Sequence, residues 1–227
     1  MGWKITSIII KTDINHSDEK IIDSFFACKF KRVEDTTFDY CHHPKEDDLI
    51  YIGNYRGNVI ITTYTLELVE KFFTDKISKA EEIIMGLFPN AEIGAFLLNS
   101  SINYYAWTII SNNQKNRAKS GDGDNGITCD YGAPLIEENH FLNMSFKHKN
   151  QLRYNWPDSQ GKIEVYTEDQ IGEEYVSKIW SRFTGIELFE DDELMEQTFR
   201  GYQFIPEEPD NSVIGNKKSF WAKLFKR

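Results

Sequence analysis

A ten-residue stretch in the first third of the chain concentrates groups that could bind a metal ion. Residues 39–48 contain the thiol of Cys41, the imidazoles of His42 and His43, and four carboxylates. A zinc site needs three or four such ligands that converge on one ion. Adjacent side chains on an extended backbone point to opposite faces, so at most two of these three can share an ion, and no spaced second pair completes the set. We therefore interpret the stretch as a polar connector that enters a strand at Leu49, and the sequence predicts neither a metal site nor a cofactor.

Residues 121–126, with the sequence Gly-Asp-Gly-Asp-Asn-Gly, have the composition of a calcium-binding loop. An EF-hand that began at Asp122 would need an oxygen ligand at its fifth position and glutamate at its twelfth, where this chain has glycine and alanine. The segment is expected to form a turn in which glycine and asparagine take positive φ angles. The alternative is a loop that faces a ligand, with Arg117 pairing an anion and Asp122 and Asp124 nearby.

The end of the chain differs in composition from the rest. Residues 217–227 carry five positive charges and no negative ones, and Pro206 and Pro209 separate them from the last expected strand. A helix would place four apolar side chains in one stripe opposite the cations. The residues expected to dock on a partner, or on the chain's own acidic surface, are Lys217, Lys218, Phe220, Trp221, Leu224 and Phe225. Contact with a membrane surface through this tail is the competing interpretation.

Composition narrows the classes of function. The chain of 227 residues has a formal net charge of −10, which argues against a general nucleic-acid-binding protein and fits a basic partner. Cys28, Cys41 and Cys129 include no CxxC pair, and scattered thiols of this kind are typical of a cytoplasmic protein. No stretch approaches the roughly 20 apolar residues that would span a bilayer.

The spacing of apolar residues predicts the elements that position these groups. Strands are expected at 3–11, 30–33, 49–52, 59–63, 91–98 and 104–110, with 116–120 running back along the last of these. Ser17 is expected to cap a first helix, and residues 173–183 form an amphipathic helix that stops at Gly185. Apolar residues at helical spacing between 66 and 87 predict two helices, the second starting near Thr74, or one long helix.

The pattern weakens after Gly121. Residues 121–169 are expected to be mostly loop, with strands only at 140–148 and 162–166, and a last strand follows at 198–205. The order of elements indicates the α+β class, a single domain over residues 1–205 whose mixed or mainly antiparallel sheet is flanked by helices. Residues 206–227 are expected to be a linker followed by the basic aromatic tail.

Several landmarks are spread along this domain. They are Met1, Gly2, Lys4, Pro44, Asp47, Asp48, Tyr51, Ile52, Gly53, Gly57, Trp107, Arg117, Ser120, Gly126, the Gly-Ala-Pro-Leu run at 132–135, Gly201, Tyr202 and Phe204. Together they resemble an uncharacterised family of bacterial proteins found largely in actinobacteria. The resemblance covers about residues 1–205 and implies one domain without a known activity. The Cys41–His43 trio and the tail lie outside the shared pattern.

The lack of a catalytic signature decides the expected function. His140 and His148 could act as general bases, but no nucleophile motif or dinucleotide-binding glycine pattern accompanies them. We expect a non-catalytic cytoplasmic protein that binds a macromolecule, with a basic protein as the partner, in the manner of immunity-type proteins. The alternative is an enzyme of unrecognised type with its site in the loops of residues 112–140. A deep pocket with a buried histidine would favour the enzyme, and a flat acidic face would favour the binding protein.

Overall fold

Runs of β-branched and aromatic residues form the strands of the protein, and amphipathic runs form its helices. A computed structural model describes residues 2–25, 29–42, 48–63, 69, 71–149 and 151–205. The strands are β1 (Lys4–Lys11), β2 (Lys29–Arg32), β3 (Thr36–Thr37), β4 (Leu49–Tyr55), β5 (Asn58–Thr63), β6 (Glu92–Asn99), β7 (Tyr104–Ser111), β8 (Gln114–Asp122), β9 (Gly126–Tyr131), β10 (Ser145–His148), β11 (Gln151–Pro157), β12 (Ile163–Tyr166) and β13 (Thr198–Ile205). The helices are α1 (Asp18–Phe25), α2 (Phe38–Cys41), α4 (Lys79–Leu87), α5 (Asn139–Asn143), α6 (Gly172–Thr184) and α7 (Asp192–Glu196). Short 3₁₀ turns are η1 (Ser100–Ile102), η2 (Ile136–Glu138), η3 (Asp169–Ile171) and η4 (Leu188–Glu190).

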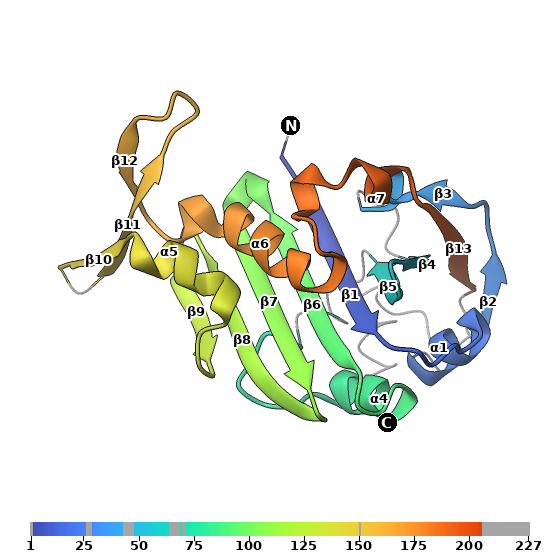
Figure 1. Cartoon of the computed structure of the whole chain (residues 1–227). Coiled ribbons are helices and arrows are strands. Elements are labelled where there is room, and N and C mark those ends of the chain that lie inside the picture. The colour runs from blue at the N-terminus through green and yellow to red at the C-terminus, as the bar shows by residue number, and fades with distance from the viewer. Residues whose placement is uncertain are drawn as a thin grey trace, which may run out of the picture.

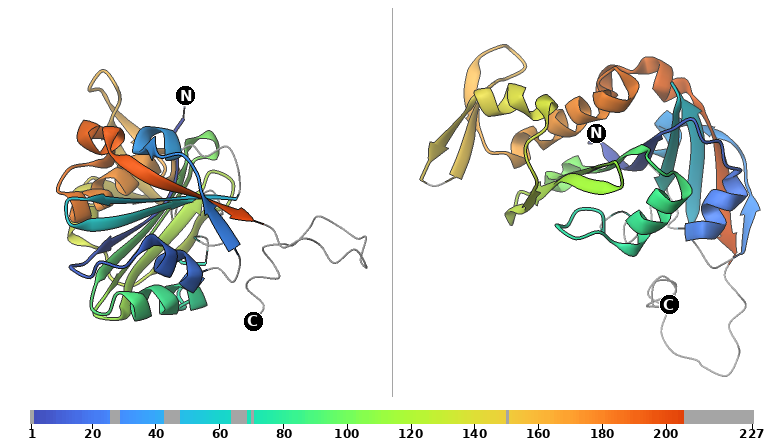
Figure 2. Two further views of the ribbon diagram at one scale, coloured as in Figure 1. Left: turned by 90° about the vertical axis from the view of Figure 1, so that its right-hand side faces the viewer. Right: turned by 60° about the horizontal axis from the view of Figure 1, so that its bottom comes forward.

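Two antiparallel sheets organise the described part of the chain. The larger is 10-stranded, in the order β2-β13-β4-β5-β1-β6-β7-β8-β9, with β3 paired to β13. The smaller sheet, β10-β11-β12, projects from the body as an arm (Figure 1). A 60° rotation shows the arm standing clear of the large sheet, with α5 and the start of α6 at its base (Figure 2).

Helices cover both faces of the large sheet, which explains the continuous apolar run in β1. Ile8 and Ile10 pack into a core that includes residues of α1 and α4. Ile9 points the other way and packs into a second core with residues of α6. Successive side chains of a strand alternate between faces, so a strand covered on both sides reads as an unbroken hydrophobic sequence.

The expected α+β class and the mainly antiparallel sheet flanked by helices are confirmed. Strands β4 and β5 pair as the predicted hairpin, around a turn in which Arg56 and Gly57 have positive φ. Helix α6 ends where its sequence predicts, because Gly185 takes the left-handed conformation of a helix C-terminus at φ 81°.

Of the two helices predicted between residues 66 and 87, the second is present as α4 but starts five residues later than Thr74, and one long helix through residues 71–78 is wrong. Residues 71–78 form turns and bends, and α4 begins at Lys79. Ser78 and Glu81 form a reciprocal capping box there. The carbonyl oxygens of residues 72, 74 and 76 accept hydrogen bonds from Lys115 of β8, so they are directed at the sheet rather than at a helical partner. Residues 64–68 and 70 lie outside the described residues.

Residues 121–169 contain more regular structure than the sequence predicts. They include β9, the three strands of the arm, and α5 at 139–143, where a strand was expected. Strand β9 has no apolar period because it forms the edge of the sheet and most of its side chains are exposed. None of the helices in the described ranges is both long and apolar enough to span a membrane. The expected boundary at residue 206 and the tail at 217–227 lie outside these ranges.

Candidate functional site

Strand β8 carries three cations, Lys115, Arg117 and Lys119, that are at most 7% exposed. Alternate residues of a regular strand point to one face of the sheet. A bulge between β7 and β8 breaks this pattern, because Ile110 lies opposite Lys115 whereas Ile109 lies opposite Arg117. Ile110 and Ile109 belong to the cores on opposite faces. Lys115 therefore turns toward α4, while Arg117 and Lys119 turn toward α6.

Lys115 forms a closed pair with Glu81, the third residue of α4. The Lys115 Nζ lies 2.8 Å from Glu81 Oε1, and both side chains are at most 2% exposed. The other carboxylate oxygen of Glu81 accepts the backbone N–H of Ser78 at 2.6 Å. Since a buried charge without a partner is costly, this pair fixes the start of α4 against β8.

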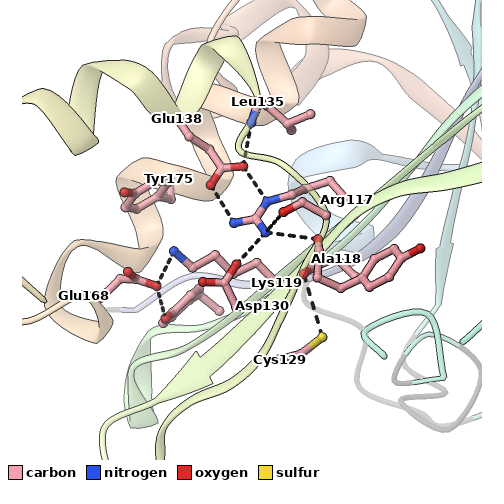
Figure 3. Close-up of polar contacts among 12 residues, drawn as sticks. Arg117, Ala118, Lys119, Cys129, Asp130, Leu135, Glu138, Glu168 and Tyr175 are labelled. Atoms are coloured by element: carbon pink, nitrogen blue, oxygen red, sulfur yellow. Dashed lines mark hydrogen bonds and ion pairs between the residues drawn. The ribbon is translucent and has the colours of Figure 1, made fainter. Parts of the chain in front are cut away.

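Arg117 is held by a bidentate contact with Glu138 of η2. Its Nε and Nη2 donate to the two Glu138 oxygens at 2.7 and 2.8 Å, and its Nη1 donates to Asp130 at 2.5 Å (Figure 3). The same Nη1 donates to the carbonyl oxygens of Tyr131 and Gly132. The guanidinium thereby joins β8, β9 and η2 in a planar, charge-assisted arrangement that lysine could not reproduce.

Gly132 is required beside this arginine. Its φ is +84°, and a Cβ built on it would lie 1.9 Å from the carbonyl oxygen of Asn116. Asn116 is the extra residue of the β8 bulge, between the paired residues Lys115 and Arg117. Only glycine permits this approach of the two backbones.

Lys119 and Glu168 form the third buried pair, together with two tyrosines. Lys119 Nζ lies 2.8 Å from Glu168 Oε1 (Figure 3). The hydroxyl of Tyr105 donates to the same oxygen at 2.6 Å. Tyr154 donates to Glu168 Oε2 at 2.5 Å, and Tyr175 donates to the Tyr154 hydroxyl at 3.3 Å. Burial first, and then the charge of Glu168, raise the pKa values of Tyr105 and Tyr154 above their usual range, so both phenols keep the protons that they donate.

An open pocket of about 510 Å³ lies against this third cluster. Among its described lining residues are the buried Tyr105 and Glu168, the acidic side chains of Asp124 and Asp169, and Arg153. Its volume lies within the range of small-ligand pockets. The turn between β8 and β9 forms one wall, and the start of β11 and residues 167–169 form the others.

Two glycines fix the position of Tyr105 at this pocket. A Cβ on Gly121 would lie 2.5 Å from the Tyr105 hydroxyl oxygen, and a Cβ on Gly172 would lie 2.5 Å from a ring carbon of Tyr105. Gly121 is the residue opposite Tyr105 in the sheet, and Gly172 begins α6. Contacts this short exclude any larger residue without displacement of the ring.

The structure separates the three residues that the sequence suggests for ligand binding. Arg117 is 1% exposed, and its guanidinium holds carboxylates and carbonyls of its own chain. Asp122 accepts the backbone N–H groups of Asp124 and Asn125, as in the turn that the sequence predicts. Hydrogen bonds from the Asn125 side chain and backbone lower the pKa of Asp122. Of the three, only Asp124 lines the pocket.

The stretch around Cys41 is helical where an extended connector was expected. Cys41 ends α2 and is fully buried, with its thiol donating to the Phe38 carbonyl. His42 packs its ring 5.0 Å from that of Trp3, while His43 lies outside the described residues. Among the residues that the structure does describe, no group of three or more histidine, cysteine, aspartate or glutamate side chains is arranged to hold a metal ion.

Comparison with known proteins agrees with the resemblance seen in the sequence. Residues 11–158 match DUF6928, a family of unknown function. The chain belongs to this family. The match to DUF6928 includes β8 with its three cations and ends before Glu168. No curated protein and no solved structure matches the chain.

Several landmarks of the resemblance meet at Arg117. Gly132 contacts the bulge beside this arginine, and the N–H of Leu135 donates to Glu138 at 3.0 Å. These landmark residues therefore stabilise the fold around Arg117. Sequence reasoning missed Lys119, Glu168 and Tyr105, although one signal was available. Arg117 and Lys119 lie in the strand expected at 116–120, which pairs with an apolar strand, and a cation that turns into the interior there requires a carboxylate.

Proposed function

We propose that this chain is a non-catalytic binding protein whose partner is a basic protein, and that the pocket beside Glu168 receives a cationic side chain of that partner. The observation that carries the proposal is the charge of the pocket. Asp124 and Asp169 lie among its lining residues, while Glu168 beneath them is already neutralised by Lys119. A lysine or arginine side chain in the pocket would therefore meet the carboxylates of Asp124 and Asp169, the second of which also accepts a hydrogen bond from Asn103.

The charge of the whole protein supports the same partner. With a formal net charge of −10, the chain attracts basic molecules over long distances and repels acidic ones. Proteins of the immunity type neutralise a basic partner by covering it, and this is the class of function proposed. We also propose that the protein acts in the cytoplasm, where the thiols of Cys41 and Cys129, which form no disulfide, remain reduced.

The pocket supports binding more strongly than catalysis. Both oxygens of Glu168 are occupied by the donors Lys119, Tyr105 and Tyr154. A general base needs an oxygen or nitrogen that can reach the proton of a substrate. The described lining residues include Asp124 from the expected 112–140 region, but they include no histidine or cysteine.

Titration calorimetry with hexalysine tests the proposal. The double variant D124N/D169N should weaken binding about five- to tenfold at low ionic strength, since two partly exposed charges are removed. R153Q should strengthen binding, because it removes the cation among the described lining residues that repels the ligand. The matched control is D192N/E196Q, which removes the same charge from α7, across the body from the arm (Figure 1).

The control variant distinguishes binding of hexalysine in the pocket from its attraction to the net negative charge of the protein. Equal weakening by D124N/D169N and D192N/E196Q would mean that hexalysine responds only to net charge, and the pocket proposal would be abandoned. Absence of hexalysine binding to the wild-type protein at low ionic strength would count against a basic partner altogether.

A further inference from the structure

The two edges of the large sheet are protected very differently. Strand β2 forms one edge and carries three cations in four residues, Lys29, Lys31 and Arg32. Strand β9 forms the other edge, and its six residues include no lysine, arginine or proline. An edge strand presents unpaired N–H and C=O groups, and charged residues, lysine above all, are a common device against unwanted pairing. The charged residue of β9, Asp130, is bound by Arg117 of the neighbouring strand, so the edge at β9 lacks this protection.

Strand β9 also exposes apolar side chains along its open edge. Ile127 is 46% exposed and Tyr131 is 39% exposed, at opposite ends of the strand. Thr128 is the extra residue of a bulge, but its hydroxyl lies 2.8 Å from that of Ser120 and so is directed back at β8. The Tyr131 carbonyl accepts from Arg117, which leaves residues 126–130 as the open part of the edge.

The open edge runs directly into the acidic pocket. Gly126 and Ile127, the first residues of β9, are among the described residues that line the pocket beside Asp124. In the register of the sheet, Ile127 lies opposite Gly121, on the face that carries Lys119 and Tyr105. A strand added along β9 would therefore present alternate side chains to this face, and one of them would lie at the pocket.

Charge selects the kind of strand that fits. Residues 122–131 contain three aspartates, Asp122, Asp124 and Asp130, and no lysine or arginine. Pairing of two copies of β9 would add a second set of these carboxylates to the same surface, and like charges repel each other. An extended segment that contains lysine or arginine would instead be attracted by them.

We infer that the partner adds an extended strand to the free edge of β9 and inserts one lysine or arginine side chain into the pocket lined by Asp124 and Asp169. This inference rests on the proposed function and gives it a mode of recognition. Backbone hydrogen bonds to residues 126–130 supply binding that does not depend on the partner's side chains, and the pocket supplies the preference for a cation. The segment recognised is about five residues long, since that is the length of the open edge.

The test uses blocked heptapeptides of alternating valine and threonine with one central lysine. A strand that pairs with β9 uses the N–H groups of only one of its own edges. Two further peptides are therefore N-methylated at alternate residues, one on each edge. We expect one methylated peptide to bind at least about tenfold more weakly than the unmodified peptide and the other to bind within about threefold of it. A peptide with norleucine in place of lysine should bind the wild-type protein about as weakly as the lysine peptide binds D124N/D169N.

The outcomes distinguish this inference from the proposed function. Equal effects of the two methylated peptides would overturn strand addition while leaving the acidic pocket intact. Binding of hexalysine without binding of the lysine heptapeptide would also overturn strand addition and leave the acidic pocket intact. If neither ligand binds, the proposed function fails as well. A dimer of the chain in sedimentation that Y131K dissociates would assign the edge to a second copy and overturn the inference.

Discussion

Three buried glutamates receive a cation from β8, yet they sit in two different kinds of surroundings. Glu81 and Glu138 are fully buried, and each also accepts a backbone N–H at the start of its own helical segment, from Ser78 and Leu135 respectively. Glu168 accepts instead from two tyrosine hydroxyls and lines an open pocket. The first two pairs fix where a helical segment meets the sheet, whereas the third shapes a surface that a ligand can reach.

The comparison shows that the contribution of a buried ion pair to stability depends on whether water can reach it. When one member of a closed pair is removed, water cannot replace it, and the remaining charge keeps only those polar groups of the protein that already contact it. A pair beside a pocket can recruit water in place of a lost donor. The expected effects of substitution therefore fall from the closed pairs to the open one, even though the chemical groups are similar.

The largest effect is expected at Arg117. Replacing it with methionine leaves the carboxylate of Glu138 buried without a counter-charge and should lower the free energy of unfolding by about 3–5 kcal/mol. R117K should recover only part of this loss, because a lysine cannot make the bidentate contact. Urea denaturation measures both variants, with R153Q as the control at an arginine beside the open pocket. A loss below about 1 kcal/mol for the methionine variant would contradict the closed-pair interpretation.

An intermediate effect is expected for E81Q on the other face of the sheet. Lys115 keeps its three carbonyl acceptors, at residues 72, 74 and 76, so its charge stays partly solvated by the protein. We expect a loss of about 2–3 kcal/mol in urea denaturation, in line with the loss of a hydrogen-bonded charged group. A loss as large as that for the methionine variant at Arg117 would show that the carbonyls contribute nothing.

Two tyrosines that donate to Glu168 allow a finer comparison beside the pocket. Both phenols are buried and each donates one hydrogen bond to Glu168, but of the two only Tyr105 is among the described lining residues of the pocket. Y154F should cost about 1–2 kcal/mol, while Y105F should cost less than about 1 kcal/mol because pocket water can donate to Glu168 instead. Thermal unfolding of the two variants under identical conditions gives the order. The reverse order would mean that water does not reach Glu168.

The smallest effect is expected at a partly exposed pair, Asp18 with Arg200. Burial alone would raise the pKa of Asp18, but hydrogen bonds from Arg200 and Tyr202 and the charge of Arg200 outweigh it, and the pKa is lowered. A lowered folded-state pKa stabilises the protein above the unfolded-state pKa, and that contribution disappears as the pH falls through the folded-state pKa. D18N should therefore cost about 0.5–1 kcal/mol at neutral pH, given that the Arg200 side chain is one-third exposed.

The effect of D18N on the free energy of unfolding should also depend on pH. The difference between wild type and D18N should be constant above about pH 5 and should shrink steadily below about pH 4. Chemical denaturation at a series of pH values measures it. A difference that grows on acidification would reverse the assigned direction of the pKa shift.

Local sequence predicted those parts of the fold whose partners are determined by position along one element. The apolar run in β1, the hairpin of β4 and β5, and the end of α6 at Gly185 are confirmed, because alternation, turn residues and a C-terminal glycine act over a few residues. The α+β class and the membership of an uncharacterised family were also available from the sequence alone.

Long-range contacts decided the rest. The start of α4 depends on Lys115, which draws the carbonyls before Ser78 toward the sheet, and this lysine faces α4 only because of the bulge beside Asn116. The pocket depends on Glu168, which meets Lys119 from a distant part of the chain. A cationic residue in a buried strand indicates that a carboxylate must lie nearby, but the sequence contains many acidic residues that could supply it. Only the packed structure selects among them, since the cost of burying a charge is decided by three-dimensional neighbours and not by position in the sequence.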